Sequence, residues 1–208
     1  MLDKCIWPSS SQGFSAASMV KALRRAAITV TAVNKGVQFK FCWKSEAPPR
    51  VKFFIWTALH NSISSLAFLA SRGIITNGNV LCDICGEEET MNHIFIHCLF
   101  VRKIWYMVFQ NLGVAWVLPY TFEEFLTQWS AIIPLGVCTK LWTTTWMIFI
   151  WEIWKCRNRR VFDNKESSVH DIVFRSFTTA VFYFKCNHPS FAYSGLDLYR
   201  NPDSILFS

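Results

Sequence analysis

The feature that most constrains this chain is the spacing of cysteine and histidine in residues 82–98, CDICGEEETMNHIFIHC. The stretch contains the pattern Cys-x2-Cys-x7-His-x4-Cys, and Zn²⁺ prefers thiolate and imidazole donors in a tetrahedral set. A glycine follows the second cysteine and permits the left-handed backbone of a tight turn. The predicted ligands are Cys82, Cys85, His93 and Cys98. Because this set leaves no open coordination position, we expect one Zn²⁺ with a structural role.

Each of these ligands has a competing interpretation. His93 and Cys98 lie five residues apart and would point well apart on a regular α-helix, so we expect a helix break near Cys98. His97 is a competing ligand, but it is adjacent to Cys98, which completes the set with less distortion. A redox role for the Cys-x-x-Cys pair would need a βαβ context that the flanking sequence does not show. Without a metal, His93 would be a capped or buried histidine and Cys98 an inert core thiol.

Composition indicates a folded chain. Its 208 residues suffice for one large or two small domains, and 52% hydrophobic residues exclude global disorder. The longest apolar stretch, 141–154, is too short to span a membrane and contains three Thr and a Glu. The start of the chain carries no secretory signal. We therefore expect an intracellular, reducing compartment, with nucleus and cytoplasm both open.

The remaining cysteines fit that compartment. They are an odd set scattered through apolar sequence: Cys5, Cys42, Cys138, Cys156 and Cys186. We expect them to be free, buried thiols rather than a disulfide framework.

The formal charge of +7 permits contact with a polyanion, although a basic balance is a weak signal by itself. The candidate nucleic-acid contacts flank or precede the predicted metal site: Lys44, Arg50, Lys52, Arg72, Arg102 and Lys103. Solvated helix faces explain such charges equally well. The basic end of the predicted helix over 139–160 also has a simple explanation, because cations stabilise the C-terminal end of a helix dipole.

Hydrophobic periodicity predicts helices throughout. The expected helices begin near Ser15, Pro48-Pro49, Leu66, Val101, Thr121, Thr139 and Val169. Proline is tolerated in a first turn, and Thr121 with Glu124 forms a capping box. In the helix after Pro49 we expect Phe53 and Trp56 to be covered. We expect Trp105 to pack under the metal site, and Glu87 to Glu89 to form a solvated loop.

The predicted architecture is a mainly α protein: a helical domain stapled by one Cys3His zinc site, followed by a long Trp-rich helix and a C-terminal helix. The expected divisions are a lead-in helix and linker (1–38), a zinc-binding domain (39–113), a helical extension (114–186) and an irregular tail (187–208).

The sequence gives no sign of an enzyme. Polymerase and ribonuclease H chemistry needs clustered carboxylates that hold metal ions, but the six Asp residues are isolated. Phosphate-binding loops and common hydrolase motifs are also missing from the sequence. We therefore expect a chain that has no catalytic activity, binds no small-molecule substrate and does not associate with a membrane.

Residues 39–110 resemble the zinc-binding domain that follows the polymerase domain in plant LINE-type, non-LTR retrotransposon reverse transcriptases. The matching residues fall in that family's order: Trp43-Lys44, Pro48 to Lys52, Phe54, Trp56, Leu69, Arg72 to Ile74, Cys82, Cys85-Gly86, Glu89-Thr90, His93, Phe95, Cys98 and Trp105. Residues 151–162 resemble the stretch that leads to the ribonuclease H domain. Arg50 replaces a usual Lys and Ser64-Ser65 a usual Thr, and neither change touches the proposed ligands.

The resemblance implies a non-catalytic module of a retroelement protein that binds RNA or DNA. Trp43 or Trp56 could stack a base of single-stranded RNA, although core packing is the favoured role for both. Two further hypotheses remain. One is a protein-interaction scaffold with a purely structural zinc, whose aromatic surface docks on a reverse transcriptase polymerase domain, and the other is a retroelement remnant without selected activity.

Overall fold

The computed structural model describes residues 41–76, 78–132 and 139–206, and this part of the chain is helical without a strand. The elements are α3 (Pro49–Leu59), α4 (Leu66–Ser71), the π-helix η1 (His93–His97), α5 (Leu99–Asn111), α6 (Phe122–Ala131), α7 (Thr139–Asp163), α8 (Val169–Asn187), α9 (Gly195–Arg200) and α10 (Pro202–Leu206). The predicted mainly α fold is confirmed. The helix expected after Ser15 lies outside the described residues.

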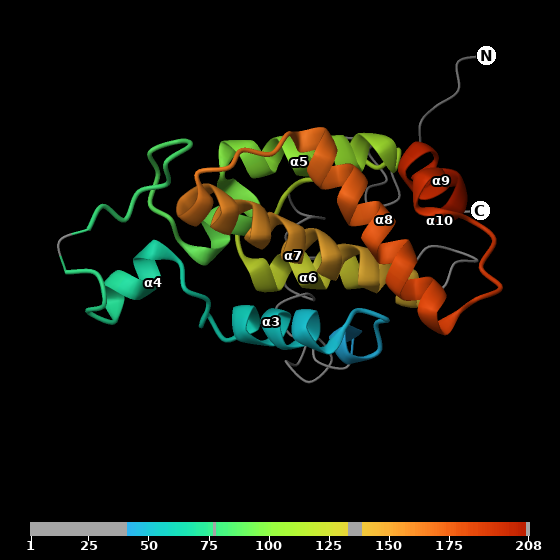
Figure 1. Cartoon of the computed structure of the whole chain (residues 1–208), viewed down its shortest axis with the longest axis horizontal. Helices are drawn as coiled ribbons and strands as arrows, with labels where there is room; N and C mark the ends of the chain where they lie inside the picture. Colours follow the sequence, from blue (N-terminus) through green and yellow to red (C-terminus); the bar gives the residue numbers. More distant parts are fainter. Residues whose placement is uncertain (1–40, 77, 133–138, 207–208) are drawn as a thin grey trace, which may run out of the picture.

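Helix α7 is the centre of the molecule. Every residue from Leu141 to Ile150 is buried, whereas an ordinary surface helix buries only one stripe. In Figure 1, α3 lies on one side of α7 and α5 on the other, while α8 crosses α7 obliquely. No described helix is long and apolar enough to cross a membrane.

Aromatic side chains fill the space between α5, α6 and α7. Trp129 and Trp142 stack with their ring centroids 4.0 Å apart. Their indole N–H groups also donate reciprocally, from Trp129 to the Trp142 carbonyl at 3.1 Å and from Trp142 to the Trp129 carbonyl at 2.9 Å. Buried polar groups need such partners, so this pair joins α6 to α7 while both rings remain fully buried.

Local signals set the helix starts. Pro49 occupies the first turn of α3, where its missing N–H costs nothing. At α6 the Thr121 hydroxyl accepts from the Glu124 amide and the Glu124 carboxylate accepts from the Thr121 amide, which confirms the predicted capping box. Serine side chains also cap α4, α8 and α9.

Two predictions about the surface are wrong. Phe53 is 61% exposed and Trp43 is 51% exposed. The buried side of α3 contains Val51, Phe54, Ile55, Ala58 and Leu59, and residue 53 points to the opposite side at 3.6 residues per turn. An apolar run in the sequence therefore did not correspond to a buried side chain at either position.

The prediction of an irregular tail over 187–208 is wrong for the described residues of that segment. They include α9 and α10, and both helices bury apolar side chains, Leu198 from α9 and Ile205 and Leu206 from α10. These helices span only five or six residues, too short for a clear helical period. One hydrophobic cluster includes Cys82 and Cys98 of the predicted metal site as well as these three C-terminal side chains.

Candidate metal centre

The first two cysteines lie in a tight turn. The Gly86 amide donates to the Cys82 carbonyl at 2.9 Å, and the Cys82 amide donates to the Glu87 carbonyl at 2.7 Å. Gly86 has φ +74°, a left-handed backbone that favours glycine. An isolated antiparallel bridge between Leu81 and Glu88 closes the base of the turn. The predicted turn geometry is confirmed.

The other two cluster residues are brought together by a π-helical turn. The Cys98 amide donates to the His93 carbonyl at 2.9 Å, which is the i→i+5 bond of a π-helix. Residues five apart therefore lie one full turn apart and on the same side. Cys98 itself is extended, with φ −53° and ψ 133°, and α5 begins at the next residue. The break expected at Cys98 is confirmed, and the π-turn explains how His93 and Cys98 meet.

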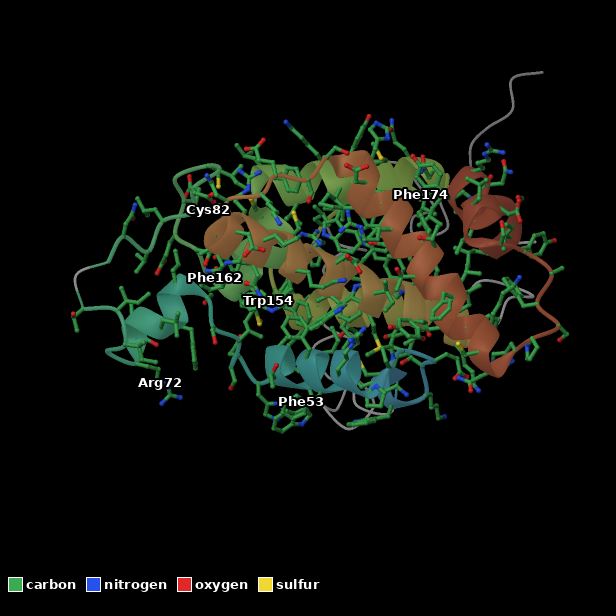
Figure 2. The ribbon with its side chains drawn as sticks, viewed as in Figure 1. Phe53, Arg72, Cys82, Trp154, Phe162 and Phe174 are labelled. Carbon is green, nitrogen blue, oxygen red and sulfur yellow. The ribbon has the colours of Figure 1, made fainter. Side chains whose placement is uncertain are left out.

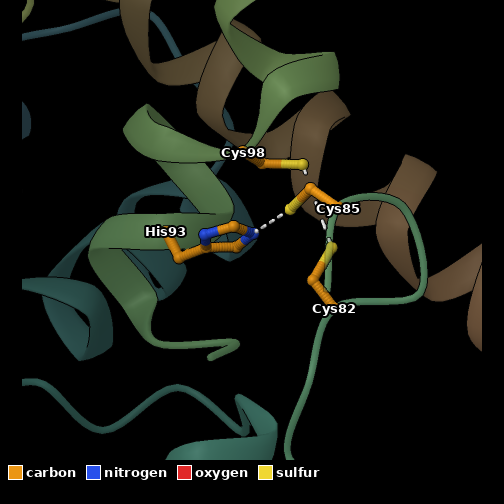
Figure 3. Close-up of side chains that lie close together, drawn as sticks. All are labelled: Cys82, Cys85, His93 and Cys98. Atoms are coloured by element: carbon orange, nitrogen blue, oxygen red, sulfur yellow. Dashed lines mark hydrogen bonds between the residues drawn. The ribbon is translucent and has the colours of Figure 1, made fainter. Parts of the chain in front are cut away.

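The four candidate ligand atoms converge (Figure 3). All lie within 4.8 Å of one another. The Cys82 and Cys98 sulfurs are 3.9 Å apart, and the Cys85 sulfur is 3.2 Å from His93 Nε2. A tetrahedral zinc site with Zn–S bonds of about 2.3 Å places sulfurs about 3.8 Å apart. The donor set and its spacing therefore fit one Zn²⁺.

Burial tunes the protonation of these side chains. It raises the pKa of the Cys98 thiol to about 12 and raises the pKa of Cys82 as well, because a thiolate is poorly solvated there. Desolvation also lowers the pKa of His93. Its imidazole is therefore neutral at pH 7, the form that binds zinc.

His97 does not join the cluster. Its Nε2 pairs instead with the Tyr120 carbonyl at 2.8 Å. Among the other cysteines, Cys42 and Cys156 are free and buried as predicted, whereas Cys186 is exposed. Cys5 and Cys138 lie outside the described residues. Cys156 lines a cavity beside Cys82 and Cys98, but it is not one of the four converging residues.

Glu89 is not part of a solvated loop, contrary to prediction. Its side chain is 3% exposed, and its two oxygens accept from Arg157 of α7, Oε1 from Nη2 at 2.5 Å and Oε2 from Nε at 3.1 Å. Oε1 also accepts from the Leu66 amide at the start of α4. A buried carboxylate needs such partners. Arg157 therefore does more than complement the dipole near the C-terminal end of α7, because it also pairs with Glu89.

This pairing was missed because its partners are 68 residues apart. The local signal was the run Glu87 to Glu89, which is typical of a solvated loop. The pair links the metal-cluster loop to both α4 and α7, so Glu89 and Arg157 position the segment that carries the cluster.

Trp105 contacts both η1 and the aromatic core. Its indole N–H donates to the Phe95 carbonyl in η1 at 2.8 Å. Its ring, however, faces the aromatic core and contacts Phe109, Phe125, Trp129 and Phe149. Trp105 thus holds the backbone between His93 and Cys98, while the described cavity beside the cluster is lined by Val101 and Ile104 instead.

The candidate cations are spread over several elements. Arg50 donates to the Tyr183 hydroxyl and Lys52 to the Trp43 carbonyl, both at 3.1 Å. Arg72 lies over the Phe68 ring. The three others, Lys44, Arg102 and Lys103, are exposed. The cations that line the cavity beside the cluster are Arg157 and Arg160, and none of the six predicted contacts lines that cavity.

A match to a known protein family covers this site. Residues 14–105 match a family model described as zinc-binding in reverse transcriptase. The matched segment includes all four converging residues together with α3, α4 and η1. No curated protein and no solved structure matches the chain.

Proposed function

We propose that this chain, whose residues 14–105 match the reverse-transcriptase zinc-binding family, holds one structural Zn²⁺ and acts as a nucleic-acid-binding module. The observation that supports the metal is the convergence of Cys82, Cys85, His93 and Cys98 within 4.8 Å. Three thiolates and an imidazole satisfy a tetrahedral ion and leave no position for a substrate.

The role of the ion would be to join the cysteine turn to η1. The described residues of the turn form no helix or named strand, only an isolated bridge and local hydrogen bonds, and bonds from an ion to the turn and to η1 would fix one against the other. Binding energy of a structural zinc contributes directly to folding energy. The expected result of metal removal is therefore loss of the local fold around residues 81–98.

Zinc analysis tests this role. Purified wild type should contain about one Zn²⁺ per chain, whereas Cys82→Ser and Cys98→Ser should lose it together with cooperative unfolding. Cys186→Ser is the matched control, because Cys186 is a free, exposed cysteine outside the cluster, and this variant should retain the metal. A folded wild type without zinc would refute the proposal.

The nucleic-acid role is supported by charge. The chain has a formal charge of +7, and Lys44, Arg102 and Lys103 expose their side chains. Phosphate contacts release counterions, so binding through them weakens steeply with salt. RNA and DNA affinity should therefore fall on raising salt from about 50 to 200 mM. Absence of binding at the lower salt would exclude this role.

A protein-docking role is the second candidate. Exposed aromatic side chains such as Phe162, 76% exposed, and Phe182, 63% exposed, favour it. The partner would be a reverse transcriptase polymerase domain. Apolar docking would persist at high salt, which separates it from phosphate binding.

A further inference from the structure

The outer side of α3 and its C-cap residue carry a row of three neighbouring rings, Phe53, Trp56 and His60, of which Phe53 and Trp56 are stacked. The Phe53 and Trp56 centroids are 5.6 Å apart with an interplanar angle of 23°, and Trp56 and His60 follow at 4.5 Å and 38°. His60 Nδ1 also pairs with the Trp56 carbonyl at 2.8 Å. We call these residues the α3 ring row. Phe53 points away from the other helices (Figure 2).

A fourth aromatic ring lies where the loop before α3 begins, at the end of the helical residues 41–43. Trp43 is 51% exposed, and its carbonyl accepts from Lys52 Nζ at 3.1 Å, which ties the start of this loop to the helix. Contiguous exposed apolar side chains mark interaction or ligand sites. The row and Trp43 together present flat apolar faces of the kind on which nucleobases stack.

Cations flank the row on both sides. At 3.6 residues per turn, Arg50 and Lys52 lie on opposite flanks of Phe53. Their contacts agree with this placement, because Arg50 reaches Tyr183 of α8 while Lys52 reaches the loop at Trp43. Lys44 is exposed in the same loop. A chain that stacks bases on the row would have positive charge along either side for its phosphates.

Negative charge is scarce in this part of the sequence. Between residues 41 and 82 the sole acidic residue is Glu46. Its carboxylate is held by Lys140 Nζ at 2.7 Å, Asn187 Nδ2 at 2.7 Å and His188 Nε2 at 3.2 Å. This segment therefore offers stacked rings and cations and no uncommitted carboxylate of its own, a combination that suits a polyanion with aromatic groups.

We propose that the outer side of α3 binds a single-stranded nucleic acid, with bases stacked on Phe53 and Trp43 and phosphates beside Arg50, Lys44 and Lys52. Bases of a duplex are already stacked on each other, so only a single strand can present them to side chains. This inference rests on the nucleic-acid part of the proposed function and narrows it to one surface and one form of ligand.

The exposed cations of α5 provide the comparison surface. Arg102 and Lys103 are exposed there near Tyr106, which is 65% exposed. The Tyr106 hydroxyl accepts from Gln110 at 2.8 Å, and no described ring stacks on it. Helices α3 and α5 lie on opposite sides of α7 (Figure 1), so the two surfaces can be tested independently.

The test measures binding of the zinc-loaded full chain to fluorescein-labelled oligo(U) and oligo(dT) by anisotropy at low salt. A DNA duplex of equal length is measured alongside. We expect Phe53→Ala and Trp43→Ala to weaken single-strand binding about tenfold each, as for loss of one stacked base. Tyr106→Ala, which removes an exposed ring of similar size from α5, should leave the affinity unchanged. Phe53→Trp should retain binding, whereas Phe53→Leu should not.

The outcomes separate this inference from the proposed function. If wild type binds neither single strand nor duplex, both fail. If wild type binds but Phe53→Ala and Trp43→Ala behave like Tyr106→Ala, the α3 site is wrong and the nucleic-acid role remains. Retention of affinity in Phe53→Leu would show apolar contact without stacking and overturn the inference. Circular dichroism and zinc content of each variant establish that the fold is intact.

Discussion

The cluster side chains differ in what zinc must displace from them. Burial raises the pKa of Cys98 to about 12 and raises that of Cys82, so both are protonated at neutral pH without metal. The pKa of His93 is lowered, so its imidazole is already neutral there and zinc binding releases no proton from it. Zinc binding must therefore release protons from at least these two thiols.

Zinc affinity should consequently rise with pH. Release of at least two protons gives an increase of at least about a hundredfold per pH unit between about pH 6.5 and 8. Competition with a chelator of known affinity, corrected for the chelator's own protonation, measures this slope. A pH-independent affinity would show that the thiols are already ionised before the metal binds.

The buried ion pair between Glu89 and Arg157 should contribute measurably to the stability of the fold. Both side chains are mostly buried, 3% and 12% exposed. Loss of one partner leaves a buried charge without compensation and costs about 3 kcal/mol or more. Arg157→Met and Glu89→Gln should each destabilise by this order, and the double variant by less than their sum. Urea unfolding of the four proteins gives the coupling, and strict additivity would contradict it.

At the scale of elements, the π-turn decides whether the cluster forms. In an α-turn, His93 and Cys98 would point apart; the i→i+5 bond at 2.9 Å brings them to one side. Trp105 supports this irregular turn through its bond to the Phe95 carbonyl. The sequence indicated that regular helix could not continue through Cys98, but not which turn would replace it.

Helix α9 depends on a close approach to α8. A Cβ added at Gly195 would lie 2.5 Å from the Thr178 Cα and 2.9 Å from its Cβ. Because the Cα belongs to the backbone of α8, relief of this clash would require the two helices to move apart. Gly195→Ala should destabilise by about 1–3 kcal/mol and raise hydrogen exchange in α9 and α10. Leu196→Ala, at a 41% exposed position of the same helix, is the control and should change stability by less than about 0.5 kcal/mol. Equal exchange in both variants would argue against tight docking.

At the scale of the whole molecule, Glu46 joins distant parts of the chain. It links the loop before α3 to Lys140 of α7 and to Asn187 and His188 at the end of α8. The hydrogen bond from Lys140 is the main cause that lowers the pKa of Glu46, with a smaller effect from His188. A lowered carboxyl pKa stabilises the fold above the unfolded value, near about 4.3.

That contribution should disappear in acid. It is fully present above about pH 5 and is lost as the pH falls through the lowered folded value. Glu46→Gln should therefore reduce the free energy of unfolding at pH 7, and the difference from wild type should shrink toward about pH 3. Urea unfolding across this range measures it. A constant difference at all pH values would mean that the carboxyl charge is not involved.

Short-range patterns in the sequence determined the four converging residues, the capping box at Thr121, the proline start of α3 and the central buried helix, because each depends on residues within one or two turns. Tertiary structure alone decided the partner of Glu89, the exposure of Trp43, and the two short helices α9 and α10. These features depend on contacts between residues far apart in the chain, such as the 68-residue separation of Glu89 and Arg157, and neither spacing nor periodicity carries that information.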